Sequence, residues 1–305
     1  MARYMLMRIL GLIAVVWFIG TITFVLMHAI PGGPWDEEKP LTQDAKANIR
    51  RMYGLDKPLT IQYLLYWRNF LRLDLGHPYQ SPVETVQGLI GRTWPASVQL
   101  GLMTIVVASV FGVALGVLGA LFQNTWIDYV STLVAIFGVV TPNFALAMAM
   151  ILLFSTTLGW LPAGGWDSPK HYIMPVICFA LGPMATLARY SRASVIDVMR
   201  EDYVRTARAK GLPESAVVVR HILRNALIPI LTVLGPMTGA LITGSIYIEA
   251  MFRIPGIGKY FTSSITARDY PMMMAITMLY AVIIAVSYLL TDLSYVLADR
   301  RVKLG

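Results

Sequence analysis

Six stretches of this chain contain no aspartate, glutamate, lysine or arginine, and each approaches or exceeds the length of a bilayer-crossing helix. They cover residues 9–35, 93–127, 129–166, 171–188, 225–248 and 270–291. A helix needs roughly 20 apolar residues to cross the hydrocarbon core. Because 56% of the 305 residues are apolar and only 14% are charged, the sequence predicts an all-α, polytopic membrane protein with six transmembrane helices.

Lysine and arginine gather in three of the regions between and beyond these stretches. They are Arg3 and Arg8, eight residues within 189–224, and the trio Arg300, Arg301 and Lys303. Six crossings place all three regions on one side, which the positive-inside rule assigns to the cytoplasm. Region 36–92, on the other side, holds eight basic and seven acidic residues. We expect a multi-pass protein of the cell membrane with both termini cytoplasmic, and a net charge of +8 that reflects this bias rather than nucleic-acid binding.

The order of these features divides the chain into three expected parts. An N-terminal tail and first transmembrane helix cover residues 1–30, and an external helical region covers 31–94. A core, residues 95–305, holds the second to sixth transmembrane helices and a cytoplasmic loop at 193–225. In the external region we expect a helix from Thr42 to Tyr53 and an amphipathic helix over 59–73, resting on the membrane surface or on the bundle. The region either caps the bundle or contacts an external partner.

Glycine and proline inside the stretches indicate close packing and backbone breaks. Gly112 and Gly116 form a GxxxG step, which lets two helices approach closely in lipid. The third, fourth and fifth stretches are interrupted by Pro142 with Asn143, Pro175, Pro183 and Pro236. Broken backbone at membrane depth is tolerated only against protein or a water-filled cavity. The pattern therefore favours a bundle that forms a pathway.

The chemistry of an enzyme is absent from the sequence. There is no His-Glu-x-x-His, no G-x-S-x-G and no pair of carboxylates at helical spacing within a stretch. We therefore expect no catalytic residue, no metal site and no cofactor bound by this chain, and we expect Cys178 to serve packing. Without a G-x-x-x-x-G-K-[ST] loop, any ATPase must be a separate subunit. A secondary carrier, which usually places carboxylates near the midplane, is the less favoured alternative.

A basic segment between the fourth and fifth stretches predicts two capped helices. A helix over residues 197–210 would begin near Asp197 and end near Lys210, an order of charges that suits the helix dipole. Gly211 would stop it in a left-handed cap, and Pro213 would open the next helix. Two helices with defined ends indicate contact with a soluble partner rather than a solvated loop.

The residues of this segment carry a resemblance to a known family. The sequence R-T-A-R-A-K-G-L-P from Arg205, followed by R-H-I-L-R-N-A-L-I-P from Arg220, resembles the cytoplasmic EAA loop of ABC importer permeases, most closely in the dipeptide/oligopeptide family. Arg205, Thr206, Ala207 and Gly211 stand at the E, A, A and G positions. Only the second alanine and the glycine match the general motif, and Arg224 replaces its closing proline.

Further landmarks of that family follow in the expected order along the whole chain. They are H-A-I-P-G-G-P at 28–34, L-D-L-G at 73–76, L-G-W-L-P at 158–162, I-E-A-M-F-R-I-P-G-I-G at 248–258 and R-D-Y-P at 268–271. Gly33 takes a position where the family usually has aspartate. Each landmark is weak alone, but their common order makes the resemblance strong.

The resemblance implies a type I ABC importer permease that forms half of a pathway for di- or oligopeptides. Its implied partners are a second homologous permease, two cytoplasmic ATPases that use ATP and Mg, an external solute-binding protein and membrane lipid. Relatives also import nickel complexes, glutathione or oligosaccharides. The residues implied to couple with the ATPases are Tyr203, Val204, Arg205, Thr206, Ala207, Lys210 and Gly211.

Polar residues at the predicted spans are the candidates for lining the pathway. They are Gln99, Thr141, Asn143, Thr243 and Ser245. A polar group in lipid needs either a partner or a wet wall. Each of these residues could instead make a hydrogen bond between helices.

Overall fold

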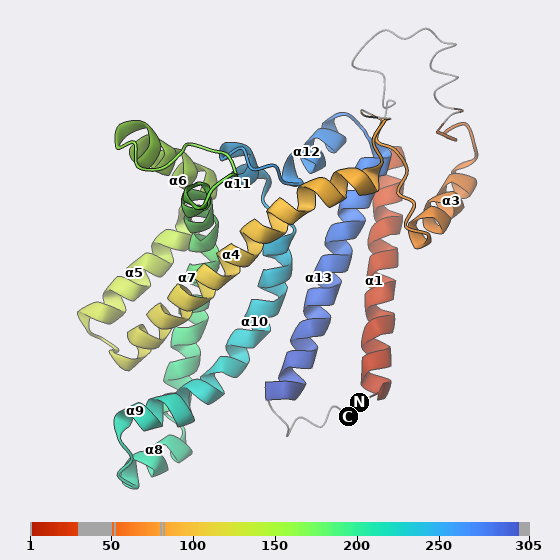
Figure 1. Ribbon diagram of the computed structural model, residues 1–305. Helices are drawn as coiled ribbons and strands as arrows, with labels where there is room; N and C mark the ends of the chain where they lie inside the picture. The colour runs from red at the N-terminus through yellow and green to blue at the C-terminus, as the bar shows by residue number, and fades with distance from the viewer. Residues whose placement is uncertain (1, 30–50, 52, 80, 82, 299–305) are drawn as a thin grey trace.

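The computed structural model describes residues 2–29, 51, 53–79, 81 and 83–298, and the side chains of residues 5–294 within these ranges. The regular elements in these ranges are all helices, arranged as a bundle of long, tilted segments (Figure 1). The predicted helix from Thr42 to Tyr53 and the Gly33 landmark lie wholly or largely outside the described residues. The all-α class is confirmed.

Among the described residues, five helical segments are long and apolar enough to cross a membrane. They are α1 (Ala2–Ala29), α4 (Val86–Leu121), α7 (Pro169–Met199), the continuous run Glu214–Ile242 that ends in α10 (Arg224–Ile242), and α13 (Tyr270–Ala298). A sixth candidate is a bent pair, α5 (Trp126–Val140) followed by α6 (Asn143–Met150) and the π-helix η1 (Ile151–Thr157), with a bend of 103°. The described residues therefore hold up to six candidate crossings when the bent pair counts as one.

The bend in the sixth candidate has the predicted cause. Thr141 ends α5 in an extended conformation, and Pro142 precedes the first residue of α6. A residue that precedes proline is pushed out of the α region, and proline cannot donate a backbone hydrogen bond. The break at Pro142 is thus confirmed. The interruptions predicted at Pro175, Pro183 and Pro236 are wrong, because these prolines lie inside continuous helices.

Helices α4 and α7 pack closely along the predicted GxxxG step. A Cβ atom on Gly112 would collide with the carbonyl oxygen of Met184, and one on Gly116 would collide with the carbonyl oxygen of Ala188. Glycine is needed at both positions because the backbones of the two helices meet there. This contact fixes α7 against the middle of the bundle.

One predicted boundary in the basic segment is wrong. Asp197 does not begin a new helix but lies in the last turn of α7, and the following helix α8 (Asp202–Ala209) begins five residues later. Between them Glu201 takes an extended conformation, with ψ 143°. The chain must change direction there because α8 turns its apolar side chains back toward α7. Helix α9 (Glu214–Ala216) and the π-helix η2 (Val217–Leu223) then lead into α10.

The short helices separate to the two ends of the bundle (Figure 1). Helices α3 (Leu59–Leu71), α11 (Ile246–Met251) and α12 (Gly258–Thr266) lie at one end. Helices α8 and α9 lie at the other, together with the start of α1 and the end of α13. The amphipathic helix expected over 59–73 is confirmed as α3. It rests on α1, where the Tyr63 and Thr21 hydroxyls lie 2.8 Å apart.

Candidate functional site

Helix α8 ends in the left-handed cap that the sequence predicts. Gly211 has φ +74°, and its N–H donates to the carbonyl oxygen of Arg208 at 2.9 Å. The N–H of Leu212 donates to the carbonyl oxygen of Ala207 at 3.4 Å. These two bonds form a Schellman motif, which satisfies carbonyl groups left open at the helix end. The end of α8 is therefore fixed by backbone bonds rather than left to fray.

The inner face of α8 packs into the chain's own core. Val204 is fully buried and Ala207 is 4% exposed. They belong to one apolar cluster with Val195 of α7 and with Val217 and Ile222 of η2. Two of the seven predicted coupling residues therefore hold α8 against the bundle and do not lie on its outer surface.

The other five predicted coupling residues are exposed: Tyr203, Arg205, Thr206, Lys210 and Gly211. The Arg205 side chain lies 3.5 Å from Asp202 and is 72% exposed, so this pair is a weak surface interaction. The Tyr203 hydroxyl accepts a hydrogen bond of 2.9 Å from the amide of Asn225. The outer face of α8 is thus polar, positively charged at Arg205 and Lys210, and available for contact.

An ion pair that the sequence analysis missed closes the turn between α8 and α9. The Arg208 guanidinium donates to both carboxylate oxygens of Glu214, at 2.6 and 3.2 Å. A two-pronged pair of this kind fixes direction as well as distance. The signal in the sequence was a pair of opposite charges on either side of Gly-Leu-Pro. The pair adds stiffness to a turn that already contains the Gly211 cap and Pro213.

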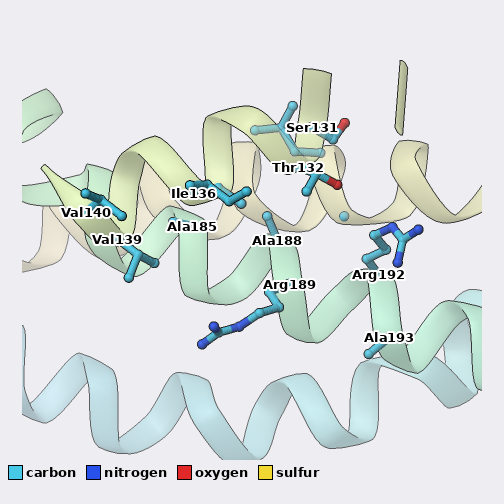
Figure 2. Close-up of a pocket in the computed structure, with 13 residues that line it drawn as sticks. Ser131, Thr132, Ile136, Val139, Val140, Ala185, Ala188, Arg189, Arg192 and Ala193 are labelled. Atoms are coloured by element: carbon cyan, nitrogen blue, oxygen red, sulfur yellow. The ribbon is translucent and has the colours of Figure 1, made fainter. Parts of the chain in front are cut away.

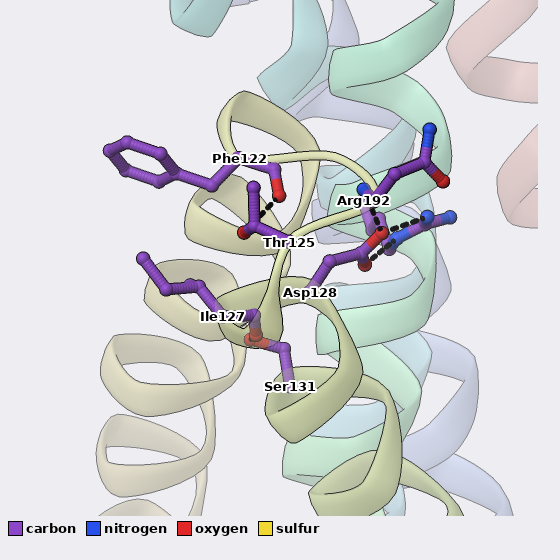
Figure 3. A network of polar contacts seen from close by, with 7 residues as sticks. Phe122, Thr125, Ile127, Asp128, Ser131 and Arg192 are labelled. Atoms are coloured by element: carbon purple, nitrogen blue, oxygen red, sulfur yellow. Dashed lines mark hydrogen bonds and ion pairs between the residues drawn. The ribbon is translucent and has the colours of Figure 1, made fainter.

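A second ion pair ties α7, which leads into α8, to the start of α5 (Figure 3). Arg192 donates to both oxygens of Asp128, at 2.7 and 2.8 Å, and the backbone N–H of Asn124 donates to the same carboxylate at 3.0 Å. The Asp128 side chain is 5% exposed and that of Arg192 is 34% exposed. Movement of the α8 end of α7 is therefore linked to the first half of the bent pair.

Of the predicted pathway residues, Gln99 lies inside α4 and the other four lie at ends or breaks of helices. Three of the five have partners within the chain. Gln99 accepts a 3.0 Å hydrogen bond from the Trp166 indole. The Thr243 hydroxyl donates to the carbonyl oxygen of Ala240 at 2.7 Å. Ser245 caps α11 by accepting from the N–H of Ile248 at 3.3 Å.

Four of the five pathway candidates lie in two pairs, and Gln99 belongs to neither pair. Thr141 and Asn143 flank the break at Pro142, and both are half-buried. Thr243 and Ser245 flank the turn between α10 and α11. Because α6 contacts α11, the two pairs belong to neighbouring elements.

A buried carboxylate near this turn is a further polar feature that the sequence did not predict. Glu249 of α11 is 2% exposed. Its carboxylate accepts from the Ser97 hydroxyl and the Gly258 N–H, both at 2.7 Å, and from the Ser245 N–H at 3.3 Å. Burial raises the pKa of Glu249 above its ordinary value, although these three hydrogen bonds act in the opposite direction.

The Glu249 site depends on glycines that leave room for the carboxylate. A Cβ on Gly244, Gly256 or Gly258 would collide with its oxygens. Ser97 links the site to α4 and in turn accepts a 3.0 Å hydrogen bond from the Ile257 N–H. The sequence I-E-A-M-F-R-I-P-G-I-G therefore encodes a fixed junction of α4, α11 and α12.

Comparisons of the sequence with known proteins identify a transport family. Residues 112–304 match the family model described as binding-protein-dependent transport system inner membrane component, and residues 1–79 match the model of its N-terminal region. The dipeptide transport system permease protein DppB of Bacillus subtilis is 43% identical over 304 residues, covering 100% of this chain and 99% of that protein. The oligopeptide transport system permease protein OppB of Escherichia coli K12 is 35% identical over 305 residues, covering 99% and 100%.

Solved structures show the same fold. An inward-facing structure of the MetNI methionine ABC transporter superposes with a TM-score of 0.58 at 15% identity, covering 70% of this chain and 97% of that one. An amino acid ABC transporter superposes with a TM-score of 0.53 at 16% identity, covering 68% and 92%. At these identities the comparison establishes the architecture alone.

Proposed function

Because this chain belongs to the family of binding-protein-dependent transport system inner membrane components, we propose that it forms half of the translocation pathway of an ATP-driven peptide importer. The family consists of transport components, so the chain is a permease subunit and not an enzyme. The relatives named for dipeptide and oligopeptide transport support peptides as the cargo. Nickel complexes, glutathione or oligosaccharides are the alternative cargoes for the same machinery.

The observation that carries this proposal is the construction of α8. Its inner face is anchored by Val204 and Ala207, while its outer face is polar and open. The Gly211 cap and the Arg208–Glu214 pair fix its end. A helix held in this way transmits displacement as a rigid body, whereas a loose loop would absorb it. We assign the contact with a cytoplasmic ATPase to Tyr203, Arg205, Thr206, Lys210 and Gly211, and the anchoring of that contact to Val204 and Ala207.

The proposed assembly contains a second homologous permease, two cytoplasmic ATPases and an external solute-binding protein. ATP and Mg would be used by the ATPases. Both described ends of the chain lie at the same end of the bundle as α8 (Figure 1), which supports cytoplasmic termini and a cytoplasmic coupling loop at 193–225. Helix α3, at the opposite end, would then belong to the external region that either caps the bundle or contacts the binding protein.

The substrate pathway would run between this chain and the second permease, along the second to sixth spans. Gln99, Thr141, Asn143, Thr243 and Ser245 remain our candidates for its polar lining. The break at Pro142 supports the inclusion of Thr141 and Asn143, because exposed backbone groups there need water or protein as a partner. For Gln99, Thr243 and Ser245, the hydrogen bonds within the chain favour a structural role.

Cysteine cross-linking tests the docking of α8. Cys178 is buried, so it should contribute little cross-linking, and a cross-link can be assigned to a cysteine introduced at an exposed position. Thr206→Cys places a thiol on the outer face of α8, and we expect it to cross-link to an ATPase subunit in membranes that contain the full importer. Tyr247→Cys is the matched control, because Tyr247 is 67% exposed on α11 at the opposite end of the bundle.

A cross-link from Thr206→Cys whose yield changes when ATP is added would support coupling through α8. Equal yields from the two positions, or no ATPase in either product, would contradict it.

A further inference from the structure

A groove on the side of the bundle has no role in the proposed coupling. It has a volume of about 350 Å³ and lies between α4, α5 and α7. Its walls include Ile136, Val139 and Val140 from α5, Ala185 and Ala188 from α7, and Gly116 from α4. Figure 2 shows the three branched side chains of α5 facing the small residues of α7. The groove exists because alanine and glycine on one wall leave the space that the larger side chains do not fill.

Two arginines on neighbouring turns of α7, Arg189 and Arg192, also line this groove. Only one of them is paired with a carboxylate of the chain. Arg192 is neutralised by its two hydrogen bonds to Asp128. Arg189 is exposed and makes no ion pair within the part of the chain that the structure describes. Thr132, which is exposed, adds a hydroxyl to the same groove. The site therefore combines an apolar trough with one uncompensated positive charge.

The position of Arg189 along α7 places this charge at a membrane boundary. It directly follows the charge-free stretch 171–188, which spans about 27 Å as a helix at 1.5 Å per residue. That length is close to the hydrocarbon thickness of roughly 30 Å. The guanidinium then lies at headgroup depth, on the side of α8, while the apolar trough extends into the hydrocarbon region.

We propose that this groove binds one anionic phospholipid, with an acyl chain along α5 and α7 and the phosphate on Arg189. The apolar walls match an acyl chain, and the uncompensated guanidinium matches a negatively charged headgroup. A transmembrane helix of a second subunit fits less well, because an apolar helix would cover Arg189 without supplying an anion. Lipid in this groove would contact both α5 and α7, the two helices that the Asp128–Arg192 ion pair holds together.

The test measures the lipid that remains bound to the importer complex. The complex is reconstituted into vesicles of equal parts phosphatidylglycerol and phosphatidylcholine, extracted in mild detergent and weighed by native mass spectrometry. A basic residue near a membrane surface contributes about 1 kcal/mol to anionic-lipid binding, which corresponds to about fivefold. We expect Arg189→Gln to lower retained phosphatidylglycerol by about that factor. Arg189→Lys should keep most of it.

Two further variants separate the groove from general surface charge. Arg200→Gln removes an exposed arginine at the end of α7 that does not line the groove, and it should leave lipid retention unchanged. Ala135→Phe fills the groove with Arg189 intact and should lower retention of the bound lipid. If Ala135→Phe fails to assemble, the comparison of Arg189→Gln with Arg200→Gln still decides the proposal, because both positions are exposed.

Two results would overturn the lipid site. One is equal phosphatidylglycerol retention in the wild type and in Arg189→Gln. The other is an efficient cross-link between Ile136→Cys and the second permease, since a protein helix would then occupy the groove.

Discussion

The left-handed conformation of Gly211, with φ +74°, is the residue-scale feature on which the end of α8 depends. A Cβ atom there would meet no atom within 4 Å, so a substitution is opposed by backbone strain and not by a collision. The left-handed region costs an ordinary L-residue roughly 1–2 kcal/mol, and asparagine is among the residues that tolerate it best. This difference gives a matched pair of variants at one position.

We expect Gly211→Val to lose most peptide uptake and the coupling of ATP hydrolysis to uptake, while the protein still inserts into the membrane. Gly211→Asn should retain both activities to a large extent, because it can keep the same φ. The measurement is peptide uptake and ATP hydrolysis in proteoliposomes with the full importer. Uptake that is unchanged in Gly211→Val would count against a fixed elbow as the coupling element.

Glu249 is a second residue whose environment makes a specific prediction. Its two carboxylate oxygens receive three hydrogen bonds from donors. In Glu249→Gln, an NH₂ group replaces one carboxylate oxygen and cannot accept a hydrogen bond from the donor that faces it. At least one hydrogen bond is therefore lost, which lowers the stability of the fold by roughly 1–3 kcal/mol. We expect a lower midpoint temperature in a thermal aggregation assay in detergent. Glu201→Gln, at an exposed position, should leave that midpoint unchanged.

Sequence reasoning anticipated Gly211 but not Glu249, and the reason is physical. A glycine after a charged helix has one dominant local use, the left-handed cap. Ser97, which donates to the Glu249 carboxylate, lies 152 positions away in the sequence, so no local pattern identifies this contact. The same applies to Val204 and Ala207, whose inward orientation follows from the packing of α8 on α7 and η2.

At the scale of elements, the junction of α5 and α7 is held by a charge pair at a largely buried site. Replacing Asp128 by Asn removes the charge that balances Arg192. Breaking a buried pair costs roughly 3–5 kcal/mol, and the partial exposure of Arg192 favours the lower end. We therefore expect Asp128→Asn to destabilise the protein by about 3 kcal/mol and to weaken the coupling of ATP hydrolysis to uptake.

The control for this element is the exposed pair Arg92–Glu84, with side chains 62% and 33% exposed. Glu84→Gln should cost less than about 1 kcal/mol. Equal losses of thermal stability in Asp128→Asn and Glu84→Gln would show that the Asp128–Arg192 pair stabilises the protein no more than an exposed ion pair does.

Two features of the helices were not predicted from the pattern of charged and apolar residues. The search for uncharged stretches ended the fourth span at Ala188, yet α7 continues to Met199. The helix carries Arg192 inside the bundle because Asp128 neutralises it. The π-helices η1 and η2 were likewise not predicted, because their wider turns are not visible in an apolar pattern.

At the scale of the whole molecule, the number of candidate crossings, the break at Pro142 and the close helix contact at Gly112 and Gly116 follow from the sequence, whereas the partner of that contact, α7, does not. Long uncharged stretches, proline and GxxxG each have a direct physical consequence in a bilayer. The cytoplasmic position that we propose for α8 rests on the basic residues in 189–224. The identity of the subunits around this chain is not encoded in such patterns and rests on the family.

The measurement that tests the account most directly is affinity purification of this tagged chain from its native membrane in mild detergent, followed by mass spectrometry of the retained proteins. We predict recovery of a second polytopic permease and of one or two ATPases with nucleotide-binding motifs, and a reduced ATPase yield from Gly211→Val. Recovery of the chain alone, or only as a homo-oligomer without an ATPase, would contradict the importer account.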